Sequence, residues 1–148
     1  MATKIFSCIP EQHLCDILQT LQAFTNLAIQ LLDENGTPIR TFGKTTGYCG
    51  LLKKNVFQKG SCAQLHAKAG LQAQELGEAY IFSCHANLNH IAYPLINQGD
   101  LLGSVIIGPF LMDQPDSTAV SVAENRPERY AKDITIRYPI HIPFSGSA

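Results

Sequence analysis

The apolar residues near the N-terminus recur at the three- and four-residue steps of an amphipathic helix. The positions that follow this spacing are Leu14, Ile17, Leu18, Leu21, Phe24 and Leu27. Such a pattern gives a helix one apolar face, which packs against a core, and one polar face. It predicts a helix over residues 10–26, ending near Thr25 or Asn26.

Two short apolar runs follow, one on each side of the sequence Asp-Glu-Asn-Gly at residues 33–36. An Asn-Gly pair is a strong local signal for a hairpin, because both central positions of the turn tolerate positive φ. Residues 27–43 are therefore predicted to form a strand, a tight turn and a second strand.

A second helix is predicted between Ser61, which can act as its N-cap, and Gly77, a natural terminator. Residues 43–50 look irregular, and residues 51–58 have no clear pattern. The predicted helix carries Cys62 and His66 on one face, because residues four apart are neighbours on a helix.

The apolar segments that follow predict the rest of a sheet. Residues 78–84 and 91–96 read as strands, residues 97–100 as a turn, and residues 101–112 as a further buried strand rich in Val, Ile and Phe. The whole predicts an α+β domain of PAS-like or GAF-like type, with an antiparallel sheet of about five strands. Helices are expected to pack on one face and to leave a small cavity.

The composition changes after Met112. Residues 113–133 are polar and interrupted by proline, which predicts a helix or an edge element outside the core. Prolines after Tyr138 argue against a packed strand there, and the final Ser-Gly-Ser-Ala resembles a linker. We therefore expect a domain over residues 1–112, followed over residues 113–148 by an extension or linker at the end of a segment cut from a longer protein.

Charge and composition narrow the function. The 148 residues include 11 basic and 12 acidic side chains with no run of either sign, so direct binding to nucleic acid is not expected. No apolar stretch is long enough to insert into a membrane. Five cysteines without a secretion signal predict reduced thiols in a cytoplasmic protein.

Three of the cysteines stand out: Cys49, Cys62 and Cys84. Their spacings match no compact zinc motif, yet a loop, a helix start and a strand end can converge at one rim of a sheet. Cys62 is expected to be the most acidic thiol, because unpaired amides at a helix start stabilise a thiolate.

Two interpretations of these thiols remain open at this point. Zinc or an iron–sulfur cluster would need a fourth ligand, for which His85, His66 and His90 are candidates. Free cysteines are also among the most buried residues, so the thiols could instead be small core side chains. For Cys8 and Cys15 we prefer the second interpretation.

Catalytic motifs give little support for an enzyme. The sequence has no Gly-x-Ser-x-Gly, no phosphate-binding Gly-x-x-x-x-Gly-Lys and no His-Glu-x-x-His. Cys84 and His85 are adjacent on a predicted strand, so they point to opposite faces and cannot activate each other directly. Cys49 or Cys62 with a distant histidine stays open as an alternative, but we expect no catalysis.

Several motifs together resemble the PocR sensory domain family. They are Tyr48-Cys49, Gly60-Ser-Cys62, Gly77, the run YIFSCHANLNHIAYPLI from Tyr80 and the run LLGSVIIGPF from Leu101. The resemblance covers roughly residues 10–112. Its most specific parts are the Cys-His-Ala element, the proline-containing strand after it, and Leu-Gly-x-x-x-x-Gly-Pro.

The resemblance implies a PAS-like input domain of AraC-type regulators and histidine kinases that binds short diols or similar hydrocarbon derivatives. It implies a covalently linked output domain, and sensors of this type often form homodimers. The ligand-binding residues expected on this basis are Cys49, Cys62, Tyr80, Phe82, Cys84, His85, His90 and Tyr93, and the candidate metal ligands are Cys49, Cys62, Cys84 and His85. The alternative is a redox or metal sensor that uses Cys49, Cys62 and Cys84.

Overall fold

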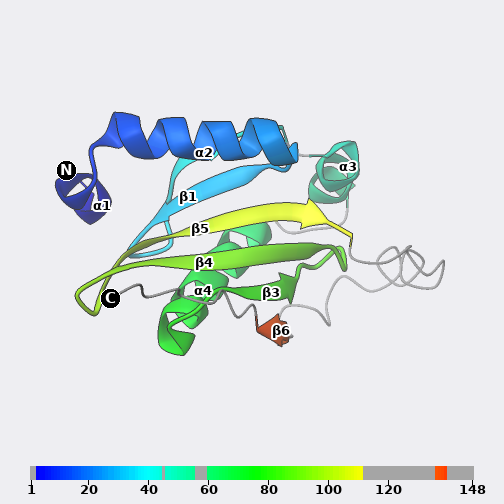
Figure 1. The fold of residues 1–148 in the computed structure, drawn as a ribbon. Helices are drawn as coiled ribbons and strands as arrows, with labels where there is room; N and C mark the ends of the chain where they lie inside the picture. The colour runs from blue at the N-terminus through cyan, green and yellow to red at the C-terminus, as the bar shows by residue number, and fades with distance from the viewer. Residues whose placement is uncertain (1–2, 45, 56–59, 112–135, 140–148) are drawn as a thin grey trace.

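The computed structural model describes residues 3–44, 46–55, 60–111 and 136–139. Figure 1 shows the elements in chain order. They are α1 (Lys4–Cys8), α2 (Glu11–Thr25), β1 (Ile29–Asp33), β2 (Pro38–Phe42), α3 (Gly47–Asn55), α4 (Ser61–Leu76), β3 (Tyr80–Ser83), β4 (Asn89–Asn97), β5 (Asp100–Phe110) and β6 (Ile136–Pro139).

The strands form one antiparallel sheet with the order β2-β1-β5-β4-β3-β6. The first five strands confirm the predicted α+β, PAS-like sheet. The sixth strand corrects the expectation for the tail, because β6 pairs with β3 despite Pro139. Proline is tolerated there since an edge strand makes ladder bonds on only one side. Residues 113–133, expected as a helix or edge element, lie outside the described residues.

The predicted hairpin is confirmed, with Ile29 opposite Phe42 in the β1–β2 register. The carboxylate of Asp33 closes the turn by accepting the N–H groups of Asn35 and Thr37 at 2.9 and 2.8 Å. Gly36 has φ of 80° and approaches Ala67 on α4 so closely that a side chain there would collide with that helix. Gly36 is therefore needed both for the turn and for the close packing of the hairpin against α4.

Helix ends were predicted with mixed success. Asn26 ends α2 in the left-handed region, where its N–H donates to the carbonyl of Gln22 at 2.8 Å. Gly77 ends α4 in the same conformation, as expected. At the start of α4, however, Gly60 occupies the N-cap position and Ser61 is the first helical residue. Glycine is also favoured at an N-cap, and the helix begins one residue earlier than predicted.

Three local predictions around the later site were wrong. Cys49 lies on α3 and not in a loop, because the hydroxyl of Thr46 accepts the N–H of Cys49 at 3.2 Å and caps a helix that two glycines had obscured. Cys84 follows β3 in a turn, where its N–H donates to the carbonyl of Leu88 at 2.8 Å. His90 lies within β4, opposite Phe82.

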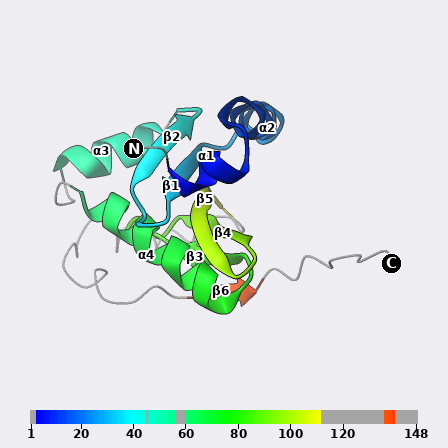
Figure 2. The ribbon, with the colours of Figure 1, turned by 90° about the vertical axis from the view of Figure 1, so that its left-hand side faces the viewer.

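Helices cover both faces of the sheet, which corrects the expectation of one covered face. Figure 2 shows α4 on one side and α1 with α2 on the other. Side chains alternate along a strand, so Leu32 of β1 joins a cluster against α4 while its neighbour Leu31 joins a cluster against α1 and α2. We call these sides the α4 face and the α2 face.

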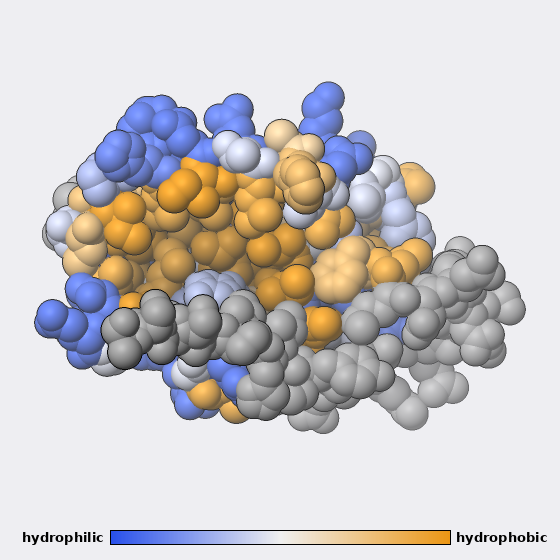
Figure 3. Space-filling model, in the orientation of Figure 1, coloured by the Kyte–Doolittle hydropathy of each residue, from blue (hydrophilic) through white to orange (hydrophobic). Residues whose placement is uncertain are grey.

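The two faces differ in how completely they are covered. The α4 face carries the fully buried Tyr80 and Phe82. On the α2 side, large apolar residues remain exposed: Ile17, Leu21 and Phe24 on α2, and Tyr93 on β4. Figure 3, in the orientation of Figure 1, shows a broad hydrophobic surface below the polar outer side of α2. In the part of the chain described, no helix is long and apolar enough to span a membrane.

Candidate functional site: a pocket on the α4 face

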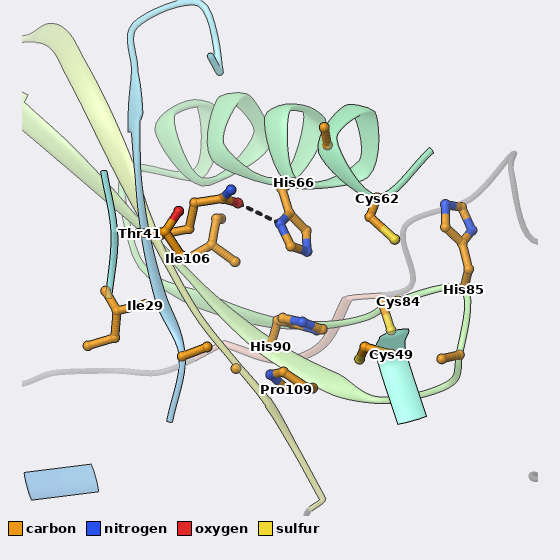
Figure 4. A pocket seen from close by; sticks show the side chains of 15 residues that line it. Ile29, Thr41, Cys49, Cys62, His66, Cys84, His85, His90, Ile106 and Pro109 are labelled. Carbon is orange, nitrogen blue, oxygen red and sulfur yellow. Dashed lines mark hydrogen bonds between the residues drawn. The ribbon is translucent and has the colours of Figure 1, made fainter. Parts of the chain in front are cut away.

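A cavity of about 150 Å³ lies between the sheet and the helices α3 and α4. Figure 4 shows the side chains around it. The lining residues are Ala28, Ile29, Gln30, Thr41, Cys49, Cys62, Ala63, His66, Cys84, His85, Ala86, His90, Ile106, Gly108 and Pro109. Most of the wall is therefore apolar, and a few polar side chains project from separate elements.

Two imidazoles occupy the centre of the pocket. Nδ1 of His66, on α4, lies 2.9 Å from Oε1 of Gln30, on β1. An amide oxygen only accepts hydrogen bonds, so Nδ1 donates the proton and the ring is held in one orientation. The ring of His90, on β4, lies 5.1 Å from that of His66 (Figure 4). The two imidazoles of the cavity are thus positioned by the helix α4 and by the strands β1 and β4.

Buried aromatic rings support these imidazoles from below. His90 is 4% exposed and stacks on Phe82, with ring centres 5.3 Å apart and an interplanar angle of 19°. Phe82 also meets the ring of His66 edge-on at 6.1 Å. Tyr80 packs beside Phe82, and its hydroxyl donates to the carbonyl of Ala69 at 3.1 Å. Burial raises the pKa of Tyr80, so its phenol stays protonated and acts in packing.

A glycine makes room for the His90 ring. At Gly108 of β5, φ is 142°, and an added Cβ would lie 2.9 Å from Cδ2 of His90 and from the carbonyl oxygen of Asn89. The β4–β5 register also shifts between Asn89 and Ile91, and such irregularities re-aim side chains. The Gly-Pro dipeptide of the sequence motif therefore shapes the pocket wall.

Three thiols gather at one end of the pocket (Figure 4). They are Cys49 of α3, Cys62 in the first turn of α4, and Cys84 in the turn after β3. Burial raises the pKa of the Cys84 thiol to about 11; backbone N–H groups of Ala86 and Leu88 oppose this shift, while the neighbouring Cys49 and Cys62 add to it. At neutral pH Cys84 is therefore a thiol and not a thiolate.

The turn that carries Cys84 lies beside the start of α4. Nε2 of His85 is 3.4 Å from the carbonyl oxygen of Ser61, the residue before Cys62. The polar pair Cys84-His85 and the helix start that carries Cys62 are separated by more than twenty positions in the sequence, yet they form one corner of the pocket.

The four candidate metal ligands lie in one pocket. Cys49, Cys62, Cys84 and His85 all line the pocket, and thiolate with imidazole is a donor set that suits zinc. Among the residues that the structure describes, however, no three or more His, Cys, Asp or Glu side chains are placed to hold a metal ion. Whether Cys49, Cys62, Cys84 and His85 bind a metal ion stays a prediction.

The structure divides the predicted ligand-binding residues into two groups. Cys49, Cys62, Cys84, His85 and His90 all line the pocket. Tyr80 and Phe82 are fully buried behind it, and Tyr93 lies 39% exposed on the α2 face, because it is one strand position away from the inward-facing Ala92. Whether the five lining residues bind a ligand stays a prediction.

Sequence reasoning missed several lining residues. Gln30 was passed over inside an apolar strand, although a polar residue between Ile29 and Leu31 was a usable signal. His66 was considered only as a metal ligand, yet its four-residue spacing from Cys62 already placed both on one face of α4. Ile106 gave no such signal, because it resembles its apolar neighbours.

Comparisons with known proteins agree with these motifs. The family model described as the sensory domain found in PocR matches residues 8–138. Regulatory protein PocR of Salmonella typhimurium is 26% identical over 102 residues, which cover 69% of this chain and 34% of that protein. The chain thus spans about a third of this relative's length. No solved structure matches the chain.

The family match extends beyond residue 112, where the resemblance in the sequence motifs ended, and reaches the residues of β6. It covers most of the chain and includes every element that forms the pocket. The chain belongs to the PocR sensory domain family, and its role is that of a sensory domain.

Proposed function

We propose that this domain is non-catalytic and that its pocket binds a small, uncharged organic molecule, of which a short diol is the best-fitting class. Ligand binding is read by a covalently attached output domain. The relative named above is a regulatory protein, which supports an output in transcription or in a histidine kinase, and a cytoplasmic location belongs to the same proposal.

The chemistry of the pocket wall carries this proposal. The described residues that line the pocket include no Asp, Glu, Lys or Arg. A charged ligand would lose its hydration and would find none of these side chains as an ion-pair partner there, which makes its binding unfavourable. A carboxylate or an amine is therefore a poorer candidate than a neutral molecule.

The size of the cavity narrows the class further. A dry cavity of similar volume in another protein binds benzene, a molecule of about six non-hydrogen atoms. The volume here, about 150 Å³, suits a molecule of that size. A three- or four-carbon diol would fill it with few voids, whereas a nucleotide or a flavin would not enter.

Polar groups are placed to orient such a molecule. His66, His90 and Thr41 present donors and acceptors from three elements, within walls formed by Ile106 and Pro109. A diol has a hydroxyl at each of two carbons and an apolar remainder, so it can use both kinds of surface. Specificity would come from the separation of the polar groups.

Signal transfer would be a population shift. The ligand favours one packing of the sheet against α2, α4 and the C-terminal segment, and the output domain responds only if the ligand binds the two packings differently. The helix α4 contributes lining residues and contacts both β4 and β5. Ligand binding would therefore change the position of α4 relative to the sheet first.

Isothermal titration calorimetry tests the ligand class directly. We expect heat of binding for 1,2-propanediol or 1,3-propanediol and none for propionate at the same concentration. Gln30→Ala, which releases the His66 ring, should weaken diol binding at least tenfold, or about 1.4 kcal/mol. Gln64→Ala, at an exposed position of the same helix α4, is the matched control and should bind normally.

The opposite results would refute the proposal. Propionate binding with no diol binding would show that the pocket recognises charge, and equal effects of Gln30→Ala and Gln64→Ala would place the ligand elsewhere. Circular dichroism on both variants separates loss of binding from loss of fold.

The exposed apolar residues of the α2 face support a homodimer. We infer that a second copy of this chain covers Ile17 and Phe24 of α2, which are 62% and 91% exposed. Exposed apolar surface of this extent is typical of interaction sites. With a formal net charge of −1, two copies repel each other little.

A further inference from the structure

The cluster of Cys49, Cys62 and Cys84 is not needed to bind a diol. Each thiol comes from a different element, and all three meet at one end of a pocket that is partly open to solvent. Small apolar side chains such as alanine would close this end equally well. Three sulfur atoms at one place therefore indicate chemistry beyond packing.

The backbone of Cys84 is fixed by its turn. The N–H of Cys84 donates to the carbonyl of Leu88 at 2.8 Å, and the N–H of Asn87 donates to the Cys84 carbonyl at 2.9 Å. These two bonds close the turn and hold Cys84 at this end of the pocket.

Cys49 and Cys62 are those neighbours. Both line the same end of the pocket as Cys84 (Figure 4). The contact between His85 and the Ser61 carbonyl also holds the Cys84 turn against the helix start that carries Cys62. Cys84 is thus the sulfur that both other thiols approach.

We propose that oxidation joins Cys84 to Cys49 or Cys62 in an intramolecular disulfide, so that this end of the pocket is a thiol switch. The inference does not depend on the identity of the organic ligand. The pocket would then respond to oxidation as well as to a ligand. The reduced protein lines the pocket with thiols and the oxidised protein with a disulfide, so the two forms would differ in affinity for a ligand.

A peroxide is the oxidant that the chemistry requires. The thiolate of Cys49 or Cys62 attacks one peroxide oxygen; an S–O bond forms, the O–O bond breaks and water leaves after protonation. The Cys84 sulfur then attacks the sulfenic sulfur; the S–S bond forms, the S–O bond breaks and a second water leaves. Two thiols lose two electrons in total, which the peroxide gains.

The order of these steps follows from the positions of the thiols. Cys84 lies in the turn that the contact between His85 and the Ser61 carbonyl holds against the start of α4, so it is placed to attack a sulfenic acid formed on a neighbouring thiol. This second step is fast because reaction between groups held together is favoured over reaction with a separate molecule.

Oxidation of the full reduced chain with hydrogen peroxide tests the proposal. Remaining thiols are blocked with N-ethylmaleimide, and the protein is digested without reductant for mass mapping. We expect a linked peptide that contains Cys84 together with Cys49 or Cys62, in monomeric protein. A linkage that lacks Cys84, a linkage only between separate molecules, or no linkage at all would overturn the proposal.

Variants and a metal analysis make the test specific. Cys84→Ser should abolish the linkage, whereas Cys15→Ser on α2, away from the pocket, should leave it unchanged. If Cys84→Ser fails to fold, the double variant Cys49→Ser with Cys62→Ser removes both partners and should also abolish the linkage. Stoichiometric zinc or iron in the reduced sample, lost in Cys84→Ser, would overturn the proposal in favour of a metal site.

Discussion

The two faces of the sheet are built from the same strands but carry different surfaces. On the α4 face, buried aromatic rings and the imidazoles of His66 and His90 surround a small cavity with defined polar contacts. On the α2 face, aliphatic side chains are partly covered by α1 and α2 and partly exposed. The first arrangement suits a small ligand that must be recognised in detail, and the second suits a partner that contributes apolar surface.

The same substitution on each face should give the clearest contrast. Phe82→Ala removes a fully buried ring that supports both His66 and His90, and we expect it to lower the free energy of unfolding by about 3–5 kcal/mol. Phe24→Ala removes a ring that is 91% exposed in the single chain, so its effect on the free energy of unfolding of the monomer should stay within about 0.5 kcal/mol. Urea unfolding of both variants measures the difference. Equal losses would mean that the two faces are not distinct in stability.

Packing of α4 against the sheet can be broken by a single methyl group. A Cβ at Gly70 would collide with the Ser104 side chain of β5, so we expect Gly70→Ala to destabilise the fold by about 1–3 kcal/mol, less the gain in helix propensity. Gly50→Ala on α3 is the control, because a Cβ there meets nothing within 4 Å. Thermal denaturation measures both effects. Equal melting temperatures of the two variants would show that Gly70 is not needed for the packing of α4 against β5.

A charge on the α2 face should separate association from folding. Phe24→Asp is expected to raise the dissociation constant of the proposed homodimer at least tenfold, about 1.4 kcal/mol, and to leave the monomer folded. Sedimentation over a range of concentrations measures this effect. If the unsubstituted chain stays monomeric at high concentration, the face serves another partner and the dimer is refuted.

The smallest effect is expected from the ion pair that joins α2 to β2. Arg40 and Glu11 are about half exposed, so solvent and salt screen their attraction. Glu11→Gln should change the free energy of unfolding by less than about 1 kcal/mol, and the change should disappear in high salt. A larger or salt-independent loss would show that this contact anchors α2 more firmly than its exposure suggests.

Local patterns predicted much of the fold. Asn35-Gly36 predicted the first hairpin, and Gly77 predicted the end of α4, because φ preferences at turns and helix ends act within a few residues. Local patterns did not predict the helix α3. Gly47 and Gly50 are poor helix formers, and the hydrogen bond from the N–H of Cys49 to the Thr46 hydroxyl is known only from the folded backbone.

The candidate site was only partly predictable. Motifs drew attention to Cys49, Cys62, Cys84, His85 and His90, all of which line the pocket. Tyr80 and Tyr93 belong to the same sequence run, yet one is buried behind the cavity and the other lies on the opposite face. A shift of one strand position changes the face to which a side chain points, so strand register had to be known.

The sequence by itself determined the α+β class, the main turns, the absence of a run of like charges and the family. The tertiary structure decided which side chains meet: Gln30 with His66, His90 with Phe82, and three thiols from three elements. The physical reason is the distance along the chain over which each interaction acts. Turn and helix signals depend on neighbours in the chain, whereas a pocket depends on strand register and on how α3 and α4 pack against the sheet.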